Sequence, residues 1–322
     1  MHLSVIICTN NPREDYLRRT LDALQQQTLP RDQWELLLID NASEEPLAGQ
    51  WDLSWHPNGR HVREDELGLT PARLRGIQES SGELLVFVDD DNVLQGEYLE
   101  ICIGIAHDQP HLGCFGAGLL EPEFETTPAE ELLPFTEMLA LRSVARASWS
   151  NVAEDCWVPW GAGLGVRRSV AEQHKSVLQS SRLGMLLDRK GDALNSCGDN
   201  QISWTACTMG YGRGVFPELR VLHLIDRRRE QRAYLLKLAQ GHAYSHAILN
   251  AIHGLPTDPT ENEPNIWQVI QAAASLSVSR FFYEGQRWWG WRSKPLVEKE
   301  FERARCAGVQ QALELLKQET DE

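Results

Sequence analysis

Short apolar runs alternate along the first part of the chain with longer segments in which apolar residues recur every three or four positions. The short runs are rich in β-branched and aromatic residues, which is typical of buried strands, and the longer segments have the period of amphipathic helices. Strands are predicted at residues 3–8, 34–39, 59–63, 84–89 and 112–116. Helices are predicted at residues 12–27, 70–80 and 96–107. This order predicts an α/β fold with a mostly parallel central sheet flanked by helices.

The first predicted helix carries a start signal. Asn11 is expected to cap its N-terminus, with Pro12 at the first helical position. Glu14 and Asp15 would then lie in the first turn, where the helix dipole favours acidic side chains.

The pattern is weaker in the second half of the chain. Residues 119–155 combine clustered acidic residues with Pro128, and we expect a long excursion over the surface there. The segment at 157–163, WVPWGAG, predicts a rigid aromatic and glycine-rich loop. Helices are predicted at residues 200–209, 231–252, 267–283 and 296–317, strands at 214–216 and 219–224, and a linker at 257–264.

Composition narrows the class of protein. The 322 residues carry a net charge of −15, which argues against broad nucleic-acid binding. No apolar run reaches the roughly 18 residues needed to span a bilayer, and the first residues do not read as a secretory signal. The seven cysteines form no CxxC pair, so neither a zinc site nor a disulfide framework is predicted. We therefore expect a cytoplasmic protein.

Three carboxylates follow directly after the apolar run at residues 84–88: Asp89, Asp90 and Asp91. Like charges at the end of a buried strand repel one another, and a divalent cation that bridges to a substrate phosphate would neutralise them. A single capping Asp would explain one of the three but not the cluster, so a metal–phosphate site is favoured over a polar turn.

Thr9 and Asp40 end two other predicted strands. In a parallel sheet they emerge at the same edge as Asp89, which is the edge where ligands bind in such folds. The chain has neither a GxGxxG after its first strand nor a P-loop sequence, so the charge of a bound diphosphate would be met by metal and by basic side chains.

Several motifs recur in one order along the chain: VIICTNN at 5–11, LIDNAS at 38–43, GLTPARLRG at 68–76, FVDDDN at 87–92, and CGDNQ at 197–201 followed by MGY at 209–211. Together they resemble the motifs of the family 2 glycosyltransferases, which have the GT-A fold. The resemblance covers roughly the first 120 residues and residues 159–223. Two positions depart from the family pattern: Gly198 stands where the family usually has Glu, and Leu74 where it usually has Asn.

The resemblance implies an inverting enzyme that moves a sugar from a nucleotide diphosphate sugar to a hydroxyl of a saccharide or lipid-linked acceptor, as in polysaccharide biosynthesis. It implies a UDP-sugar as donor and Mn²⁺ or Mg²⁺ as cofactor. It also divides the chain into a GT-A domain at 1–225 and a C-terminal helical extension at 226–322. Within the domain, residues 1–118 would bind the nucleotide sugar and residues 119–225 the acceptor.

The resemblance further implies roles for individual residues. Nucleotide-sugar binding is expected of Thr9, Asn11, Asp40, Arg73, Asp89 and Asp90. Asp91 and His223 are expected to hold the metal, and Asp199 to act as the catalytic base. A wall that faces the sugar is expected from Trp160, Gly161, Ala162 and Gly163.

Some site residues have a structural alternative. Asp199 would also serve as the N-cap of the helix at 200–209, and His223 would also be a packed residue at the end of an apolar strand. Arg228 and Arg229 belong to a basic run that is either a solvated helix start or a site for an anion, such as a diphosphate or the phosphate of a lipid-linked acceptor.

Two other functions fit the sequence less well. A sugar-1-phosphate nucleotidyltransferase would need a glycine-rich, basic loop after the first strand, and CTNNP at 8–12 is not such a loop. A non-catalytic module that binds sugar or protein is disfavoured because both the acidic cluster and Asp199 are present. The Trp-rich segment at 287–294 suits peripheral membrane contact, a homodimer contact or packing onto its own domain, and packing is favoured.

Overall fold

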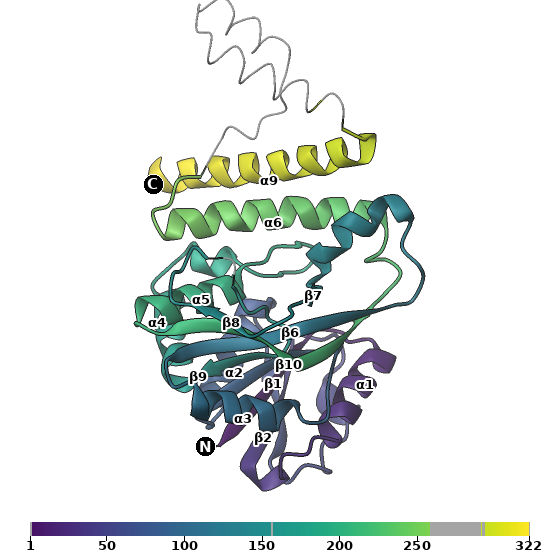
Figure 1. The fold of residues 1–322 in the computed structure, drawn as a ribbon, viewed down its shortest axis with the longest axis vertical. Coiled ribbons are helices and arrows are strands. Elements are labelled where there is room, and N and C mark those ends of the chain that lie inside the picture. Colours follow the sequence, from purple (N-terminus) through teal and green to yellow (C-terminus); the bar gives the residue numbers. More distant parts are fainter. Residues whose placement is uncertain (1, 156, 258–290, 292–293, 322) are drawn as a thin grey trace, which may run out of the picture.

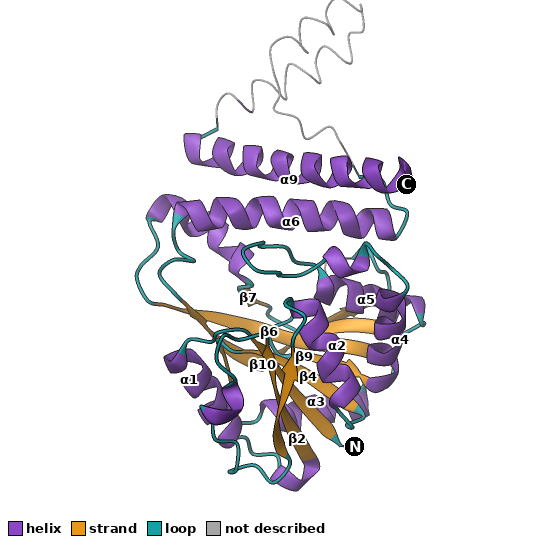
Figure 2. Ribbon diagram, turned by 180° about the vertical axis from the view of Figure 1, so that it is seen from behind, coloured by secondary structure: helices purple, strands orange, loops and turns teal. Residues whose placement is uncertain are grey.

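The computed structural model describes residues 2–155, 157–257, 291 and 294–321. Within these residues ten strands form one sheet in the order β3-β2-β1-β4-β9-β6-β10-β5, with β7 paired to β6 and β8 to β10. Helices cover both faces of the sheet (Figures 1 and 2). The predicted α/β fold is therefore confirmed, and its second half adds antiparallel strands to the parallel ones.

Four parallel strands bring their carboxyl ends to one edge of the sheet. They are β1 (Leu3–Thr9), β2 (Trp34–Asn41), β3 (Gly59–Glu64) and β4 (Leu84–Asp89). In the register of these strands Thr9 lies beside Asp40, and Cys8 lies beside Asp89. The predicted convergence of three polar strand ends at this edge is confirmed.

The strands alternate their side chains between two apolar cores. On one face, Val5 and Ile7 pack with α1 (Glu14–Gln25) and α3 (Tyr98–Asp108). On the other face, Ile6 packs with α2 (Leu69–Glu79), α4 (Arg168–Gln179) and α5 (Gly198–Thr208). Because both faces are covered, the central strands are apolar almost throughout, as parallel strands usually are.

The first helix starts later than its sequence signal predicts. The N-cap of α1 is Arg13, which makes no capping hydrogen bond, so the predicted cap at Asn11 is wrong. Asn11 has a left-handed φ of 46°, and its side-chain oxygen accepts a hydrogen bond from the Glu44 N–H at 2.9 Å. The Asn11 side chain therefore joins the loops after β1 and β2 and does not cap the helix. Glu14 and Asp15 do lie in the first turn.

The predicted surface excursion at residues 119–155 is wrong in its first part. Strand β6 (Leu112–Phe124) continues through this region and pairs with β10 (Gly212–Ile225). The acidic residues that suggested a loop lie at the exposed end of β6, where Glu123 pairs with Arg19. Beyond β6 the chain forms η3 (Glu130–Leu139), β7 (Arg142–Ser143) and β8 (Ser148–Ser150).

Strand β10 is one strand and not the predicted two. Pro217 lies at a shift in the β6–β10 register between Phe216 and Arg220. Proline has no N–H for the ladder, so it is tolerated at such an irregularity, and the sequence pattern breaks there although the strand does not. The remaining short elements are β5 (Asn92–Leu94), β9 (Leu164–Arg167), η1 (Arg31–Gln33), η2 (Leu47–Gly49) and η4 (Gly184–Leu186).

Two long helices lie side by side at the end of the molecule opposite the N-terminus (Figures 1 and 2). They are α6 (Arg232–Ile252) and α9 (Leu296–Asp321). Their backbones approach closely at Gly308, where an added Cβ would lie 2.1 Å from the carbonyl oxygen of Gln240. Phe301 of α9 stacks on Phe135 of η3, with ring centroids 3.6 Å apart. Apolar packing thus joins this helical pair to the domain.

The predicted helix at 267–283 and most of the Trp-rich segment lie outside the described residues. Trp291 is described and is buried, with the guanidinium of Arg303 5.3 Å from its ring centroid. In the described part of the chain, every helix is too short or too polar to cross a membrane.

Candidate functional site

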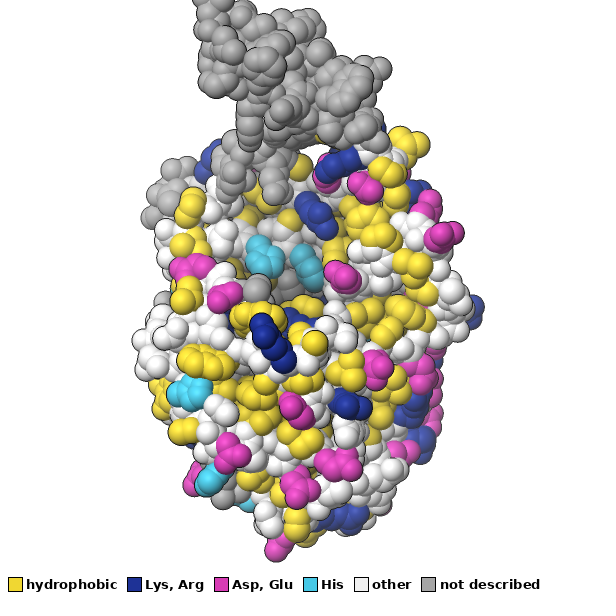
Figure 3. All heavy atoms as spheres, in the orientation of Figure 1, with side chains coloured by type: hydrophobic (Ala, Val, Ile, Leu, Met, Phe, Trp, Pro, Cys, Tyr) yellow, Lys and Arg dark blue, Asp and Glu magenta, His cyan; other side chains and the backbone are white. Residues whose placement is uncertain are grey.

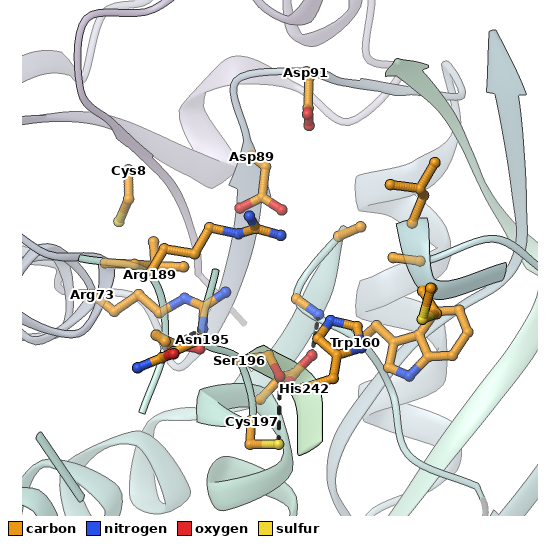
Figure 4. A pocket seen from close by; sticks show the side chains of 18 of the residues that line it. Cys8, Arg73, Asp89, Asp91, Trp160, Arg189, Asn195, Ser196, Cys197 and His242 are labelled. Carbon is orange, nitrogen blue, oxygen red and sulfur yellow. Dashed lines mark hydrogen bonds and ion pairs between the residues drawn. The ribbon is translucent and has the colours of Figure 1, made fainter. Parts of the chain in front are cut away.

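A cavity of about 780 Å³ opens at the carboxyl edge of the parallel strands, where α6 forms part of its wall. Histidine and basic side chains gather where this face is hollowed (Figure 3), and Figure 4 looks into the cavity. Its lining brings together the following predicted residues: Thr9, Arg73, Asp89, Asp90, Asp91, Trp160, Gly161, Ala162, Asp199, His223 and Arg229.

Four predicted site residues do not line this cavity: Asn11, Asp40, Gly163 and Arg228. Asp40 is buried and holds the loop after β2, because its carboxylate accepts hydrogen bonds from the Ser43 N–H at 3.1 Å and the Leu47 N–H at 3.1 Å. It also pairs with Arg63 at 2.8 Å. Burial alone would raise the pKa of Asp40, but these hydrogen bonds hold it below its ordinary value.

Gly163 and Arg228 are absent from the cavity lining for different reasons. Gly163 has a φ of +75°, and its carbonyl accepts a hydrogen bond from the Tyr98 hydroxyl at 2.7 Å. An added Cβ at Gly163 would lie 2.3 Å from that hydroxyl oxygen, so the position requires glycine for packing. The Arg228 side chain is 78% exposed and pairs with Asp226 at 3.1 Å.

The carboxylates at the end of β4 have different surroundings. Asp89 points into the cavity toward the Arg189 guanidinium (Figure 4), and burial, followed by the charge of Asp91, raises the pKa of Asp89. Asp90 accepts a hydrogen bond from the Thr9 hydroxyl, and burial raises the pKa of Asp90. Asp90 therefore joins the ends of β1 and β4 in addition to lining the cavity.

Asp91 meets His223 and Arg229 at one point. Its Oδ2 lies 2.6 Å from Nη1 of Arg229 and 3.3 Å from Nε2 of His223. Nη1 of Arg229 also lies 3.3 Å from Nε2 of His223. Burial alone would raise the pKa of Asp91, but His223 and Arg229 hold it well below its usual range. A guanidinium N–H can only donate, so Asp91 Oδ2 directs a lone pair at the Arg229 position, and His223 Nε2 does so in the tautomer that carries its proton on Nδ1.

The oxygen and nitrogen donors of Asp91 and His223 fit a divalent cation such as Mn²⁺. Neighbouring ligands of an octahedral ion with bonds of about 2.1 Å lie about 3.0 Å apart, close to the 3.3 Å between Oδ2 and Nε2. His223 Nδ1 and Arg229 Nε are buried without a hydrogen-bond partner among the described residues. No group of three His, Cys, Asp or Glu side chains in the described chain is arranged for a metal, so further ligands would come from substrate or water.

Asp199 is the second residue of α5 and not its N-cap, which is Cys197. Its Oδ2 accepts a hydrogen bond from the Gly161 N–H at 2.9 Å, and its Oδ1 accepts one from the Asn200 N–H at 2.8 Å. Burial, and then the charge of Asp188, raises the pKa of Asp199 above its ordinary value, although Arg73 and the two backbone N–H groups oppose the shift. Asp199 is therefore a fixed carboxylate and a stronger base than an exposed Asp.

Asp188 fills the space left by the departure from the family pattern at Gly198. An added Cβ at Gly198 would lie 1.9 Å from Oδ2 of Asp188, and Oδ1 of Asp188 accepts the Gly198 N–H at 2.9 Å. The same carboxylate forms an ion pair with Arg73 at 2.8 Å, and both side chains are buried. A carboxylate from another segment thus occupies the position where the family usually has Glu.

The aromatic loop joins this network through Gly161. An added Cβ at Gly161 would lie 2.5 Å from Nη2 of Arg73, so only glycine lets the loop approach the ion pair. Trp160 lines the cavity beside this glycine, and the Arg142 guanidinium lies 3.7 Å from the Trp160 ring centroid.

Further residues line the cavity and were not predicted from the sequence: Asp188, Arg189, Asn195, Tyr234, His242 and His246. The Arg189 guanidinium donates a hydrogen bond to the Tyr234 hydroxyl at 3.2 Å, and His242 lies near Trp160 (Figure 4). One signal could have found the histidines, because a spacing of four places His242 and His246 on one face of the predicted helix. The segment with Asp188 and Arg189 gave no comparable pattern.

The sequence model of Glycosyl transferase family 2 matches residues 4–173, which is more than half of the chain. The chain belongs to glycosyl transferase family 2. The matched region contains the strand ends, the acidic cluster and the Trp160 loop of this family 2 glycosyltransferase, whereas Asp199 and His223 lie beyond it.

Individual relatives of this glycosyltransferase agree with that assignment. Glycosyltransferase AglE of Haloferax volcanii is 32% identical over 101 residues, which are 30% of this chain and 33% of AglE. The chain thus spans about a third of the length of this curated relative. The structure of the mannosyltransferase PcManGT from Pyrobaculum calidifontis in complex with GDP-Man and Mn²⁺ superposes with a TM-score of 0.57. That match has 18% identity and covers 97% of this chain and 87% of PcManGT, so it shows the shared GT-A fold.

Proposed function

We propose that this glycosyltransferase moves a sugar from a nucleotide diphosphate sugar to a hydroxyl of a saccharide or lipid-linked acceptor, with inversion at the anomeric carbon. The proposal rests chiefly on one observation: Asp199 and the Asp91–His223 pair line the same cavity. An inverting transfer needs a base for the acceptor hydroxyl and charge stabilisation for the departing diphosphate. These two groups would supply both.

The donor would bind along the carboxyl edge of the parallel strands. Thr9 and Asp90 lie there, and Asp89 presents a carboxylate to the cavity that the hydroxyls of a ribose could donate to. The family resemblance favours UDP as the nucleotide, whereas the PcManGT complex contains GDP-Man. A donor screen therefore has to include both bases.

Asp91 and His223 would hold the divalent cation, which when bound would supply positive charge to the departing diphosphate. The chain's own contribution is to fix these donors: Asn92 donates a hydrogen bond to Oδ1 of Asp91 at 2.9 Å, which orients Oδ2 toward His223. The Mn²⁺ of the PcManGT complex supports the choice of this ion.

Asp199 would remove the proton from the acceptor hydroxyl as its oxygen attacks the anomeric carbon. Two backbone N–H groups fix the orientation of its carboxylate, and its raised pKa brings it nearer to the pKa of an efficient base at neutral pH. Arg73 favours the deprotonated form of this carboxylate, because its positive charge lowers the pKa of Asp199.

The acceptor would lie between the aromatic loop and α6. Trp160 can offer a ring face to the apolar face of a sugar. Burial, together with nearby positive charge from Arg189, lowers the pKa of His242 to about 4, so its imidazole is neutral at pH 7. A neutral imidazole donates and accepts hydrogen bonds, which suits the hydroxyls of a saccharide.

The test is the substitution Asp199→Asn. Transfer should fall by about 100-fold to 10,000-fold, because a general base typically contributes that much, while the donor nucleotide still binds. Turnover and calorimetric binding of the nucleoside diphosphate measure the two effects. Asp192→Asn is the matched control, since Asp192 is exposed, does not line the cavity and should leave both quantities unchanged. Loss of nucleotide binding in Asp199→Asn would instead assign Asp199 to the support of the Gly161 loop.

A further inference from the structure

The Arg229 guanidinium occupies the place where the proposed cation would bind. It contacts Asp91 Oδ2 at 2.6 Å and His223 Nε2 at 3.3 Å, which are the two donor atoms that the cation requires. The guanidinium lies directly in front of both donor atoms, and its positive charge repels a cation at that position. The Arg229–Asp91 pair and the metal complex therefore exclude each other.

We propose that Arg229 is an internal counter-ion that leaves Asp91 when the metal and the donor diphosphate bind, and that it then pairs with the diphosphate. This inference rests on the proposed function and adds a coupling between metal and nucleotide. In this structure Arg229 neutralises a partly buried carboxylate, whose negative charge would otherwise be costly to desolvate.

The arrangement of Arg229 allows this exchange. Its backbone N–H is anchored to Asp226 in the turn before α6, with the carbonyl oxygen at 2.9 Å, so the side chain can move without the backbone. Its Nε is buried and has no hydrogen-bond partner among the described residues, so the guanidinium is not fully satisfied beside Asp91. A diphosphate offers bidentate acceptors that match the guanidinium fork.

Charge balance couples the binding of the divalent cation to the binding of the nucleoside diphosphate. A divalent cation alone would add two positive charges while displacing the positive charge of Arg229 into the cavity. A nucleoside diphosphate that arrives with the cation supplies negative charge for both. Metal alone should therefore bind weakly, and metal with nucleotide should bind strongly.

The experiment measures Mn²⁺ binding to the full chain from the electron paramagnetic resonance signal of the free ion, without nucleotide. Arg229→Met should tighten this binding by about tenfold or more. In most wild-type molecules Arg229 blocks the donor atoms, and the small fraction that is competent to bind raises the apparent dissociation constant for Mn²⁺. Arg228→Met is the matched control: it removes an equal charge from the neighbouring residue, whose side chain pairs with Asp226, and should leave Mn²⁺ affinity unchanged. Asp91→Asn should abolish binding in both backgrounds.

A second titration measures nucleoside diphosphate binding with and without Mn²⁺. Mn²⁺ should strengthen UDP or GDP binding more in the wild type than in Arg229→Met. The proposed exchange of Arg229 for the metal would be overturned if Arg229→Met bound Mn²⁺ no more tightly than the wild type. It would also be overturned if Arg228→Met gained as much Mn²⁺ affinity as Arg229→Met. Absence of Mn²⁺ binding in all variants would also overturn it, and nucleotide binding on the same samples then shows whether the donor site of the proposed function survives.

Discussion

At the scale of residues, a carboxylate from one segment of the chain fills a space in the site that a glycine from another segment leaves open. Asp188 fills the position that Gly198 leaves open, and its carboxylate pairs with Arg73 beside the proposed base, Asp199. Asp188 itself has a left-handed φ of 68°, which is uncommon for a residue other than glycine. Strained conformations of this kind persist where the surrounding structure determines them fully, and they are often found at functional sites.

The substitution Asp188→Asn should move the acid limb of the kcat/KM pH profile to lower pH. The base works when deprotonated, so the rate falls as the pH drops through its pKa. The negative charge of Asp188 raises the pKa of Asp199, so its removal lowers that pKa, and an uncompensated Arg73 lowers it further. A lower rate with an unmoved profile would show that Asp188 acts only on local structure.

A second substitution, which returns a carboxylate to the site, provides the control for Asp188. Asp188→Ala should lower kcat/KM by about 100-fold, because Arg73 and the Gly198 N–H lose their common partner and the site is misplaced. Adding Gly198→Glu to that variant places a carboxylate back in the vacated space and should restore part of the loss.

At the scale of elements, α6 places Tyr234, His242 and His246 on the cavity, and α9 packs against α6 from outside. The close approach of the two helices at Gly308 leaves no room for a side chain. The geometry of the cavity therefore depends on a helix that contributes no residue to its lining.

Gly308→Ala and Gly104→Ala should have opposite effects on stability. Both glycines lie inside helices, where alanine is normally better by about 0.5–1 kcal/mol. At Gly104 of α3 no atom lies within 4 Å of an added Cβ, so the gain should be realised. At Gly308 the Cβ would meet the Gln240 carbonyl, and overpacking should cost about 1–3 kcal/mol. Denaturant unfolding measures both, and equal stabilisation of the two variants would contradict the packing of α9 on α6.

The strands and their polar ends could be predicted because the information is local: apolar runs followed by Thr9, Asp40 or Asp89 define both element and edge. The contact partners of each side chain could not be predicted in this way. Asp40 turns to Arg63 and its own loop, whereas the partner of Asp91 is Arg229, 138 residues away. Contacts of that separation are set by the place of β10 in the sheet and by the turn that leads from it into α6, which no local pattern records.

At the scale of the whole molecule, the cavity combines distant parts of the chain. The strands of the first half supply the acidic cluster, α5 supplies Asp199, and β10 and the turn after it supply His223 and Arg229. The protein carries a net charge of −15, yet Arg73, Arg189 and Arg229 gather around this cavity. The same lining carries the carboxylates of Asp89, Asp90, Asp91, Glu137, Asp188 and Asp199. A bound cation that takes over one of these carboxylates would leave a guanidinium available to an anionic ligand.

The most direct measurement incubates the full chain with a panel of UDP- and GDP-sugars, Mn²⁺ and saccharide acceptors, and follows nucleoside diphosphate release and the anomeric configuration of the product. We expect metal-dependent release with at least one donor, stimulated by an acceptor, and a product whose anomeric configuration is opposite to that of the donor. Absence of release with every donor, together with absence of metal-dependent nucleotide binding, would contradict the proposed transfer.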